Sequence, residues 1–137
     1  MKVIEFIGMP RAGKTEQINR LSKYFESQSI KHLIITDREV EKEINVPLTK
    51  AFEYNILFYN KILDKLLTAI YSNKYEFIIL DRGFSEADVW FNSEYKQGNL
   101  LKEEKELSLN YLKNLRKYID TSILMMVNPE VTIKRHI

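Results

Sequence analysis

Residues 8–15 read GMPRAGKT, a complete G-x-x-x-x-G-K-[ST] phosphate-binding loop. The loop follows a short apolar run at residues 3–7 and opens an amphipathic segment. Glycines at both ends let the backbone curl so that successive N–H groups point at one phosphate, and the next helix adds its positive dipole end. The chain has only four glycines, and two of them stand where the loop requires them. This pattern therefore predicts a strand, a loop and a helix that bind a nucleoside triphosphate.

The expected nucleotide contacts come from the whole loop and the residue after it. These residues are Gly8, Met9, Pro10, Arg11, Ala12, Gly13, Lys14, Thr15 and Glu16. Lys14 would reach the β- and γ-phosphates of ATP, and the Thr15 hydroxyl would bind Mg²⁺. A glycine turn before a helix, with no ligand, is the alternative interpretation.

Composition limits the partners and the location. The 137 residues are 45% apolar and 29% charged, which suits one globular domain with its own core. The absence of Cys excludes disulfides and fits a reducing, cytoplasmic location. The net charge of +2, with scattered Lys and Arg, argues against a nucleic-acid partner. No signal peptide or run long enough to span a bilayer is recognisable, so no membrane partner is expected.

Short apolar runs alternate with longer segments of helical periodicity, which is typical of βαβ units around a parallel sheet. Strands are predicted at residues 2–7, 32–36, 76–80 and 122–127. Helical stripes are formed by Ile18, Leu21 and Phe25, by Ile56, Tyr59, Leu63, Leu66 and Ile70, and by Leu107, Tyr111, Leu115 and Tyr118. A last helix is predicted to start at Pro129. The expected fold is a single α/β domain over residues 1–137, with a parallel sheet between layers of helices.

The run FIILD at residues 77–81 ends a predicted strand in Asp81. In a phosphate-loop fold this carboxylate would approach the Mg²⁺ that Thr15 binds. Hydrolysing ATPases usually carry a second acid next to that Asp, whereas this chain has Arg82 and then Gly83. Because a cation can bind an anionic acceptor but cannot activate water, the sequence favours phosphoryl transfer over hydrolysis.

Two segments resemble a known family. RAGKTEQ at residues 11–17 is similar to the phosphate loop of eukaryote-like thymidylate kinases, and the Asp81-Arg82 pair is similar to their Asp-Arg motif. The residues Pro129, Glu130, Val131, Lys134 and Arg135 resemble the start of the helix that leads into the lid of that family. The resemblance implies a three-layer P-loop NTPase of the nucleotide kinase type, with strand order 2-3-1-4. Related deoxynucleoside kinases share the fold and usually have Glu-Arg-Ser in place of Asp-Arg-Gly.

The resemblance implies a role for each matching residue. Arg11 would stabilise the transferring phosphoryl group as an arginine finger, beside Lys14. Arg82 would bind the acceptor phosphate, and Asp81 the metal or its waters. Arg38 and Lys61 stand where the family places further acceptor-binding cations. A solvated loop cation is the alternative interpretation of Arg38.

Aromatic residues on both sides of the Asp-Arg pair are candidates for the acceptor base. Tyr54, Leu57, Phe58 and Lys61 share one predicted helix face, which suits a base that stacks and a phosphate that pairs. Packing against a neighbouring helix explains the same face without a ligand. Where the family lines its base pocket, this chain has Phe84, Trp90, Phe91 and Tyr95, of which Trp90 is the foremost candidate.

The chain departs from the family, and two of the departures affect the predicted site and sheet. Pro10 replaces an acidic residue of the family's loop, which removes a contact to the acceptor sugar. Full-length relatives continue past the position of Ile137 through a lid and a fifth strand, so we expect both to be absent from residues 1–137. The strand at 122–127 would then present an apolar edge, which predicts a homodimer or poor solubility.

The expected activity is ATP- and Mg²⁺-dependent phosphoryl transfer to a small-molecule nucleotide acceptor, a nucleoside monophosphate. Such an acceptor is already anionic, so no general base is required. One alternative is a kinase for a nucleoside or another small molecule, in which Asp81 would accept a hydroxyl proton. The other is a non-catalytic nucleotide-binding domain. Without a lid, residues 1–137 are expected to turn over slowly.

Overall fold

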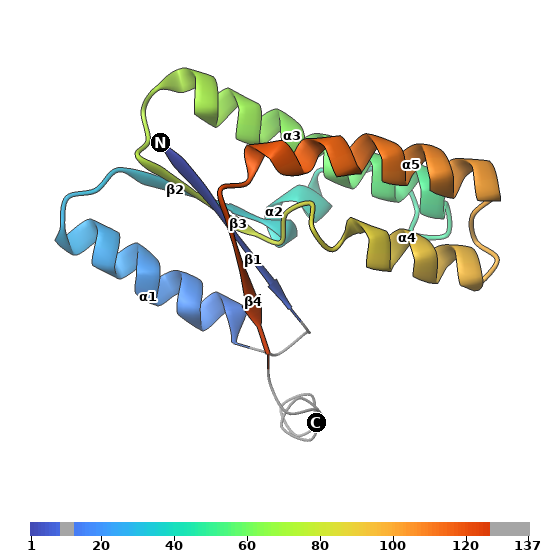
Figure 1. Cartoon of the computed structure of the whole chain (residues 1–137), viewed down its shortest axis with the longest axis horizontal. Coiled ribbons are helices and arrows are strands. Elements are labelled where there is room, and N and C mark those ends of the chain that lie inside the picture. Colours follow the sequence, from blue (N-terminus) through green and yellow to red (C-terminus); the bar gives the residue numbers. More distant parts are fainter. Residues whose placement is uncertain (9–12, 127–137) are drawn as a thin grey trace.

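The computed structural model describes residues 1–8 and 13–126. The helices and strands of this part follow one another along the chain as α/β units (Figure 1). Their bounds are β1 Lys2–Gly8, α1 Lys14–Ser27, β2 His32–Thr36, α2 Asp37–Lys42, α3 Ala51–Ser72, β3 Phe77–Asp81, α4 Ala87–Lys96, α5 Lys102–Leu115, the 3₁₀ turn η1 Arg116–Tyr118, and β4 Thr121–Met125.

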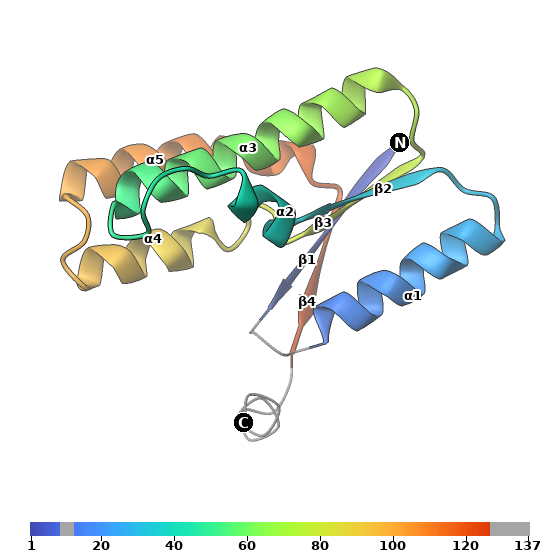
Figure 2. The same ribbon diagram turned by 180° about the vertical axis from the view of Figure 1, so that it is seen from behind.

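The four strands form one sheet in the order β2-β3-β1-β4, and each neighbouring pair is parallel. Helix α1 covers one face, and α3, α4 and α5 lie on the other (Figures 1 and 2). The predicted strand order and the three-layer α/β fold class are therefore confirmed. Phe6 of β1 and Thr36 of β2 both lie opposite Asp81, so the carboxyl ends of these three strands meet at one edge. Ligands bind at this edge in open α/β sheets.

Successive strand residues enter two cores, one on each face of the sheet. Phe6 and Ile79 pack with Ile18 and Phe25 of α1. Their neighbours along the strands, such as Ile78, pack with α3 on the other face. Because both faces are covered, the strands are continuous apolar runs instead of alternating ones.

The long helix α3 buries the face that the sequence predicts. Tyr59 and Leu66 are fully buried, and Ile56, Leu63 and Ile70 pack against the same core. The prediction for α5 is wrong in part, because Leu107 and Tyr111 are exposed. The inward face of α5 carries Ser108, Leu112 and Leu115, which is displaced by one residue from the predicted stripe. Ser108 fits inside because its hydroxyl donates to the Glu104 carbonyl within the helix, at 2.7 Å.

Two short helices, α2 and α4, were not anticipated by the periodicity. Thr36 caps α2 by accepting a hydrogen bond from the Glu39 N–H at 3.2 Å. Thr36 followed three residues later by Glu39 is a recognisable helix start. Six residues are too few for a hydrophobic period, however, so only the cap marks this helix. Helix α4 buries just Ala87 and Phe91, which gives an equally weak pattern.

Strand β4 forms one edge of the sheet, and the side chain of Leu124 on it is 59% exposed. Pairing of this edge with a second copy stays a prediction. Val127 and the helix expected from Pro129 lie outside the described residues. None of the described helices is both long enough and apolar enough to cross a bilayer.

Candidate functional site

The two glycines of the phosphate loop both adopt backbone conformations that favour glycine. Gly8 ends β1 at φ +148°, and a Cβ there would collide with the backbone carbonyl of Met125. Gly13 has φ +94° and precedes the first turn of α1. The predicted contacts Met9, Pro10, Arg11 and Ala12 lie outside the described residues. The described ends of the loop thus have the geometry that the motif requires.

Lys14 and Asp81 meet at the carboxyl edge of the sheet. Lys14 begins α1, Asp81 ends β3, and the Lys14 Nζ lies 3.5 Å from the Asp81 Oδ1. Both side chains are only 12% exposed. Thr15 and Glu16 lie on the exposed side of the same helix turn, where Glu16 forms an ion pair with Arg20 at 2.7 Å. The motif lysine and the strand carboxylate are therefore brought together across the sheet edge.

The surroundings of the Asp81 carboxyl raise its pKa. Burial raises its pKa, the negative charge of Asp37 raises it further, and the cations Lys14 and Arg82 oppose the shift. The Asp81 Oδ1 faces the Lys14 Nζ at 3.5 Å, beyond the usual hydrogen-bond length, and accepts no hydrogen bond from the described groups. Buried oxygens without a hydrogen bond are rare, so this one fits a place next to Mg²⁺ or one of its waters.

No group of three or more His, Cys, Asp or Glu side chains within residues 1–8 and 13–126 is arranged to hold a metal ion. Sites that use one or two protein ligands and complete the Mg²⁺ sphere with phosphates and water do not need such a group. Asp81 with the Thr15 hydroxyl fits that kind of site.

Arg82 lies between an acid and an aromatic ring. Its Nη1 is 3.8 Å from the Asp37 Oδ2, and its Cζ lies 5.0 Å from the centre of the Trp90 ring. The backbone of Arg82 is left-handed, at φ +71°. Its Nε is buried and has no hydrogen-bond partner among the described groups. The guanidinium is thus held in place and still has a donor available for a ligand.

A cavity of about 370 Å³ opens beside Arg82. It brings together four of the residues predicted to bind the acceptor: Tyr54, Phe58, Arg82 and Trp90. The rest of its lining consists of Glu41, Leu48, Asn55, Tyr59 and Glu94. Burial, with a contribution from the charge of Glu41, raises the pKa of the Tyr54 phenol. The cavity therefore combines aromatic walls with negative charge.

Two predicted acceptor cations lie elsewhere. Lys61 lines a separate cavity with Leu57, and its Nζ lies 3.7 Å from the Glu43 carboxylate. Tyr54 and Phe58 turn toward the Arg82 cavity, so the predicted four-residue face of α3 is divided between two cavities. Arg38 is exposed on α2. Neither Arg38 nor Lys61 lines the cavity beside Arg82, and their roles as acceptor ligands remain predictions.

The other aromatic residues after the Asp-Arg pair differ in their surroundings. Phe84 and Phe91 are fully buried in the core. Tyr95 is partly exposed, and the Lys105 Nζ lies 4.1 Å from the centre of its ring. Of the four aromatic residues considered for the base pocket, Trp90 lines the cavity beside Arg82.

Sequence reasoning missed three acidic residues around the site. Asp37 pairs with Arg82, and its place directly after strand β2 was the available signal. Glu86 accepts a hydrogen bond from the N–H of Gly8, the first loop glycine, at 3.0 Å. Glu5 is a fully buried acid in the middle of β1, and its carboxylate contacts the segment after Arg82. A charged residue inside a buried strand was its signal.

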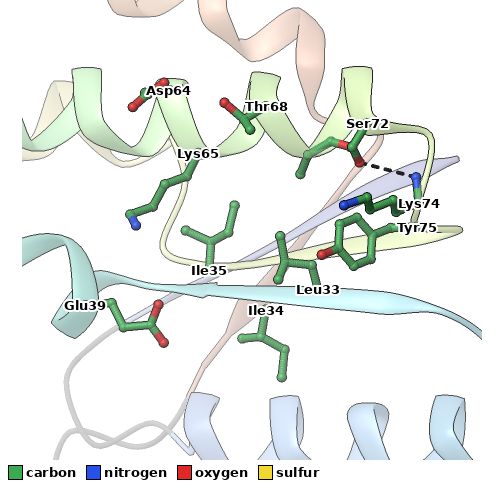
Figure 3. Close-up of a pocket in the computed structure, with 11 residues that line it drawn as sticks. Leu33, Ile34, Ile35, Glu39, Asp64, Lys65, Thr68, Ser72, Lys74 and Tyr75 are labelled. Atoms are coloured by element: carbon green, nitrogen blue, oxygen red, sulfur yellow. Dashed lines mark hydrogen bonds between the residues drawn. The ribbon is translucent and has the colours of Figure 1, made fainter.

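A further cavity of about 380 Å³ lies between the outer edge of β2 and helix α3 (Figure 3). Leu33 and Ile35 point from β2 toward α3, while Ile34 points to the opposite face of the sheet. None of the residues predicted for nucleotide or acceptor binding lines this cavity.

Comparison with known proteins was made at three levels. No family model matches this sequence, and no curated protein matches it. Two solved structures of deoxyadenosine kinase from M. mycoides resemble the chain. The one with bound dATP is 20% identical with a TM-score of 0.66, and the alignment covers 97% of this chain and 69% of that one. The one with the products dCMP and a flexible dCDP is 19% identical with a TM-score of 0.63, over 97% and 68%. At this identity the likeness shows that the chain has the fold of these P-loop kinases.

Proposed function

We propose that this chain transfers the γ-phosphoryl group of ATP to a hydroxyl group of a nucleoside. The observation that carries the proposal is the Asp37 carboxylate, whose Oδ2 lies 3.8 Å from the Nη1 of Arg82, a residue that lines the cavity. Asp81 and Lys14 occupy the same edge. A potential base is thus present next to the acceptor cavity and close to the phosphate-binding lysine.

The charges around the cavity favour an acceptor without a phosphate. Glu41 and Glu94 line it, and the guanidinium of Arg82 is already paired with Asp37. A monophosphate would add a charge of about −1.5 to −2 to these acids. A nucleoside is uncharged, and its flat base suits the ring of Trp90 and the ring of Phe58.

The chemistry follows from these positions. The acceptor hydroxyl would lie against Asp37, which takes its proton as the hydroxyl oxygen bonds to the γ-phosphorus and ADP leaves. Lys14 binds the β- and γ-phosphates throughout. Thr15 and Asp81 would hold Mg²⁺, which neutralises charge on the phosphates when bound. Arg82 orients the Asp37 carboxylate through their ion pair.

The likeness to deoxyadenosine kinase supports the same class of acceptor, since that enzyme is named for a nucleoside and one of its structures holds dCMP as a product. The second candidate is a nucleoside monophosphate kinase, which the Asp81-Arg82 motif favours. Its structural support is the buried, unpartnered Nε of Arg82 in the described part of the chain, a donor that a phosphate could use. The two candidates differ in whether Asp37 is needed.

An acceptor panel tests the proposal. ADP release from Mg·ATP is measured in a coupled assay with deoxyadenosine, deoxycytidine or thymidine, with dCMP or dTMP, and without acceptor. We expect release that depends on a nucleoside and clearly exceeds the rate with water alone. Release that depends only on a monophosphate would establish the second candidate. Equal release without any acceptor would identify an ATPase, and no release with ATP bound would indicate a non-catalytic domain.

A further inference from the structure

The segment after β3 adopts a conformation that its own sequence does not favour. Arg82 has φ +71°, in the left-handed region that side chains other than glycine rarely adopt. Its N–H still donates to the Phe6 carbonyl at 3.0 Å, as if the strand continued. Such a backbone persists only where the surroundings hold it in place. The contacts of the next residues identify what holds it.

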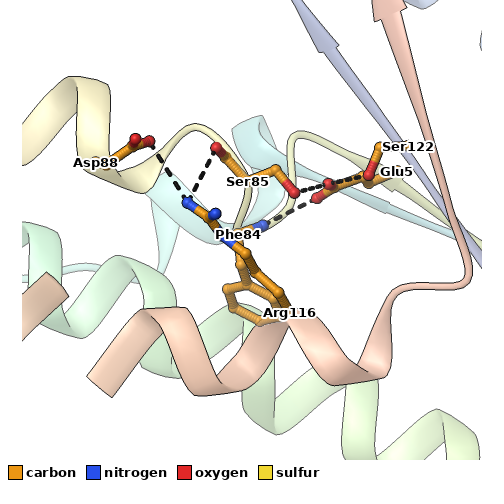
Figure 4. Close-up of polar contacts among 6 residues, drawn as sticks. All are labelled: Glu5, Phe84, Ser85, Asp88, Arg116 and Ser122. Atoms are coloured by element: carbon orange, nitrogen blue, oxygen red, sulfur yellow. Dashed lines mark hydrogen bonds and ion pairs between the residues drawn. The ribbon is translucent and has the colours of Figure 1, made fainter. Parts of the chain in front are cut away.

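The carboxylate of Glu5 accepts hydrogen bonds from three uncharged donors (Figure 4). Its Oε2 accepts from the Phe84 N–H at 3.0 Å. Its Oε1 accepts from the hydroxyl of Ser85 and from that of Ser122, the latter at 2.6 Å. Glu5 is fully buried on β1, and Ser122 belongs to β4. The carboxylate therefore ties the segment after Arg82 to two strands of the sheet.

Gly83 lets the carboxylate come this close. A Cβ on Gly83 would run into the Glu5 Oε2, so a larger residue would displace either the turn or the acid. The Phe84 ring is fully buried in the core, 6.4 Å from the ring centre of Tyr59. Glu5 thus lies against Gly83 and accepts hydrogen bonds from Phe84 and Ser85, while the Phe84 ring is also held in the core.

We propose that Glu5 is a positioning residue for Arg82. By holding the turn at 83–85, it keeps the Arg82 backbone left-handed and places the guanidinium between Asp37 and the Trp90 ring. The geometric part of this inference stands on the contacts alone. Its consequence for acceptor binding rests on the proposed function.

The alternative is that Glu5 only stabilises the sheet. The fluorescence of Trp90 distinguishes this role from the positioning of Arg82. It is the only tryptophan in the sequence, and the Arg82 guanidinium lies over its ring. Tryptophan emission and quenching by acrylamide therefore report on the position of Arg82. An Arg82→Ala variant gives the reference signal of the ring without the guanidinium.

The decisive variants are Glu5→Ala and Glu5→Gln in the full chain. Glu5→Ala leaves the three donors without an acceptor, and we expect the quenching constant to move at least halfway to the Arg82→Ala value. In Glu5→Gln the amide oxygen can accept from Phe84, while the NH₂ group donates to both serine hydroxyls. We expect this conservative variant to restore the wild-type signal.

Gly83→Ala keeps the proposal testable if Glu5→Ala does not fold. Its methyl group displaces the carboxylate from the turn, so we expect the same change in quenching. Asp120→Ala is the matched control, because Asp120 also accepts a backbone hydrogen bond on β1, from the Val3 N–H at 2.7 Å, at the other end of the strand. This control should lower stability and leave the Trp90 signal unchanged.

Wild-type emission and quenching in folded Glu5→Ala and Gly83→Ala would overturn the proposal, as would an equal change in Asp120→Ala. If a nucleoside acceptor is found, Glu5→Ala should raise its KM several-fold and leave the KM of ATP unchanged. A shifted Trp90 signal in a protein that phosphorylates no acceptor would refute the proposed function and leave the positioning role intact.

Discussion

Two acids on neighbouring strands, Glu5 and Asp81, have opposite surroundings. Glu5 lies in the middle of β1 and is fully buried, and three hydrogen-bond donors satisfy its carboxylate. Asp81 lies at the end of β3, where its Oδ1 faces the Lys14 ammonium at 3.5 Å and accepts no hydrogen bond from the described residues. Burial and the charge of Asp37 raise the Asp81 pKa. The hydrogen bonds of the Glu5 carboxylate are therefore satisfied within the fold, whereas one oxygen of Asp81 lacks a hydrogen bond from the described part of the chain.

The difference indicates what each acid does. A buried carboxylate with all its donors rigidifies the structure around it, which suits a residue that positions others. A buried carboxylate oxygen without a hydrogen bond lowers the stability of the folded state until a ligand supplies the missing partner. Functional sites often contain groups of the second kind. The comparison therefore separates the supporting residues inside the sheet from the ligand-binding residues at its edge.

The largest effect is expected at the edge, from Asp37→Asn. If Asp37 takes the hydroxyl proton of the acceptor, kcat should fall by about 10²- to 10⁴-fold, the usual contribution of a general base. The KM of ATP should stay near the wild-type value. Steady-state kinetics with the best nucleoside measures both, with Glu39→Gln on the same short helix as the control. A rate within threefold of wild type would exclude the base role.

The second largest effect is expected from Lys14→Ala. Without the ammonium group, ATP binding should weaken by about 2 to 3 kcal/mol, the range for a charge-assisted hydrogen bond. Lys61→Ala is the control, because Lys61 faces Glu43 and lines another cavity. Calorimetry that gives equal ATP affinities for wild type and Lys14→Ala would end the nucleotide-site interpretation.

A smaller effect is expected inside the sheet, from Ser122→Ala. This change removes one donor from the satisfied Glu5 carboxylate and should lower the free energy of unfolding by about 1 kcal/mol. ATP affinity should not change. Urea unfolding measures the stability, with Ser93→Ala as the control. The Ser93 hydroxyl accepts a solvent-exposed hydrogen bond from Gln97, so little change is expected. A loss of ATP affinity in Ser122→Ala would contradict the claim that Glu5 supports the fold without taking part in nucleotide binding.

The smallest effect concerns the pH dependence of stability. Since the folded-state pKa of Asp81 is raised, its protonated form stabilises the fold fully below the ordinary pKa of about 3.9, and that stabilisation is lost as the pH rises through the raised value. Asp81→Asn mimics the protonated form. Its thermal midpoint should match wild type at the lowest pH and exceed it increasingly up to a plateau. A constant difference at every pH would contradict the raised pKa.

Much of the site could be predicted because its signals are local. The glycines of the phosphate loop follow from backbone geometry, and Asp81 follows from the end of an apolar run. These residues are neighbours in space because of the strand order, which the resemblance to P-loop kinases implied and the sheet confirms.

The remainder depends on tertiary contacts that no local pattern encodes. Lys61 shares a helix face with Tyr54 in any helical projection, yet Glu43 lies in a loop whose path is set by packing, and it pairs with Lys61. Glu5 was visible as a charge inside an apolar strand. Its partners Phe84 and Ser122 are 79 and 117 residues away along the chain, so its role required the fold.

The measurement that most directly tests the contrast between the two acids is the stabilisation of the protein by Mg·ATP. Thermal midpoints are compared with and without Mg·ATP for wild type, Glu5→Gln and Asp81→Asn. At about 100 times Kd, bound Mg·ATP should stabilise wild type and Glu5→Gln alike, by about 2.7 kcal/mol. Asp81→Asn should start from a higher midpoint and gain much less. An equal gain in Asp81→Asn and wild type would show that Asp81 does not take part in nucleotide binding.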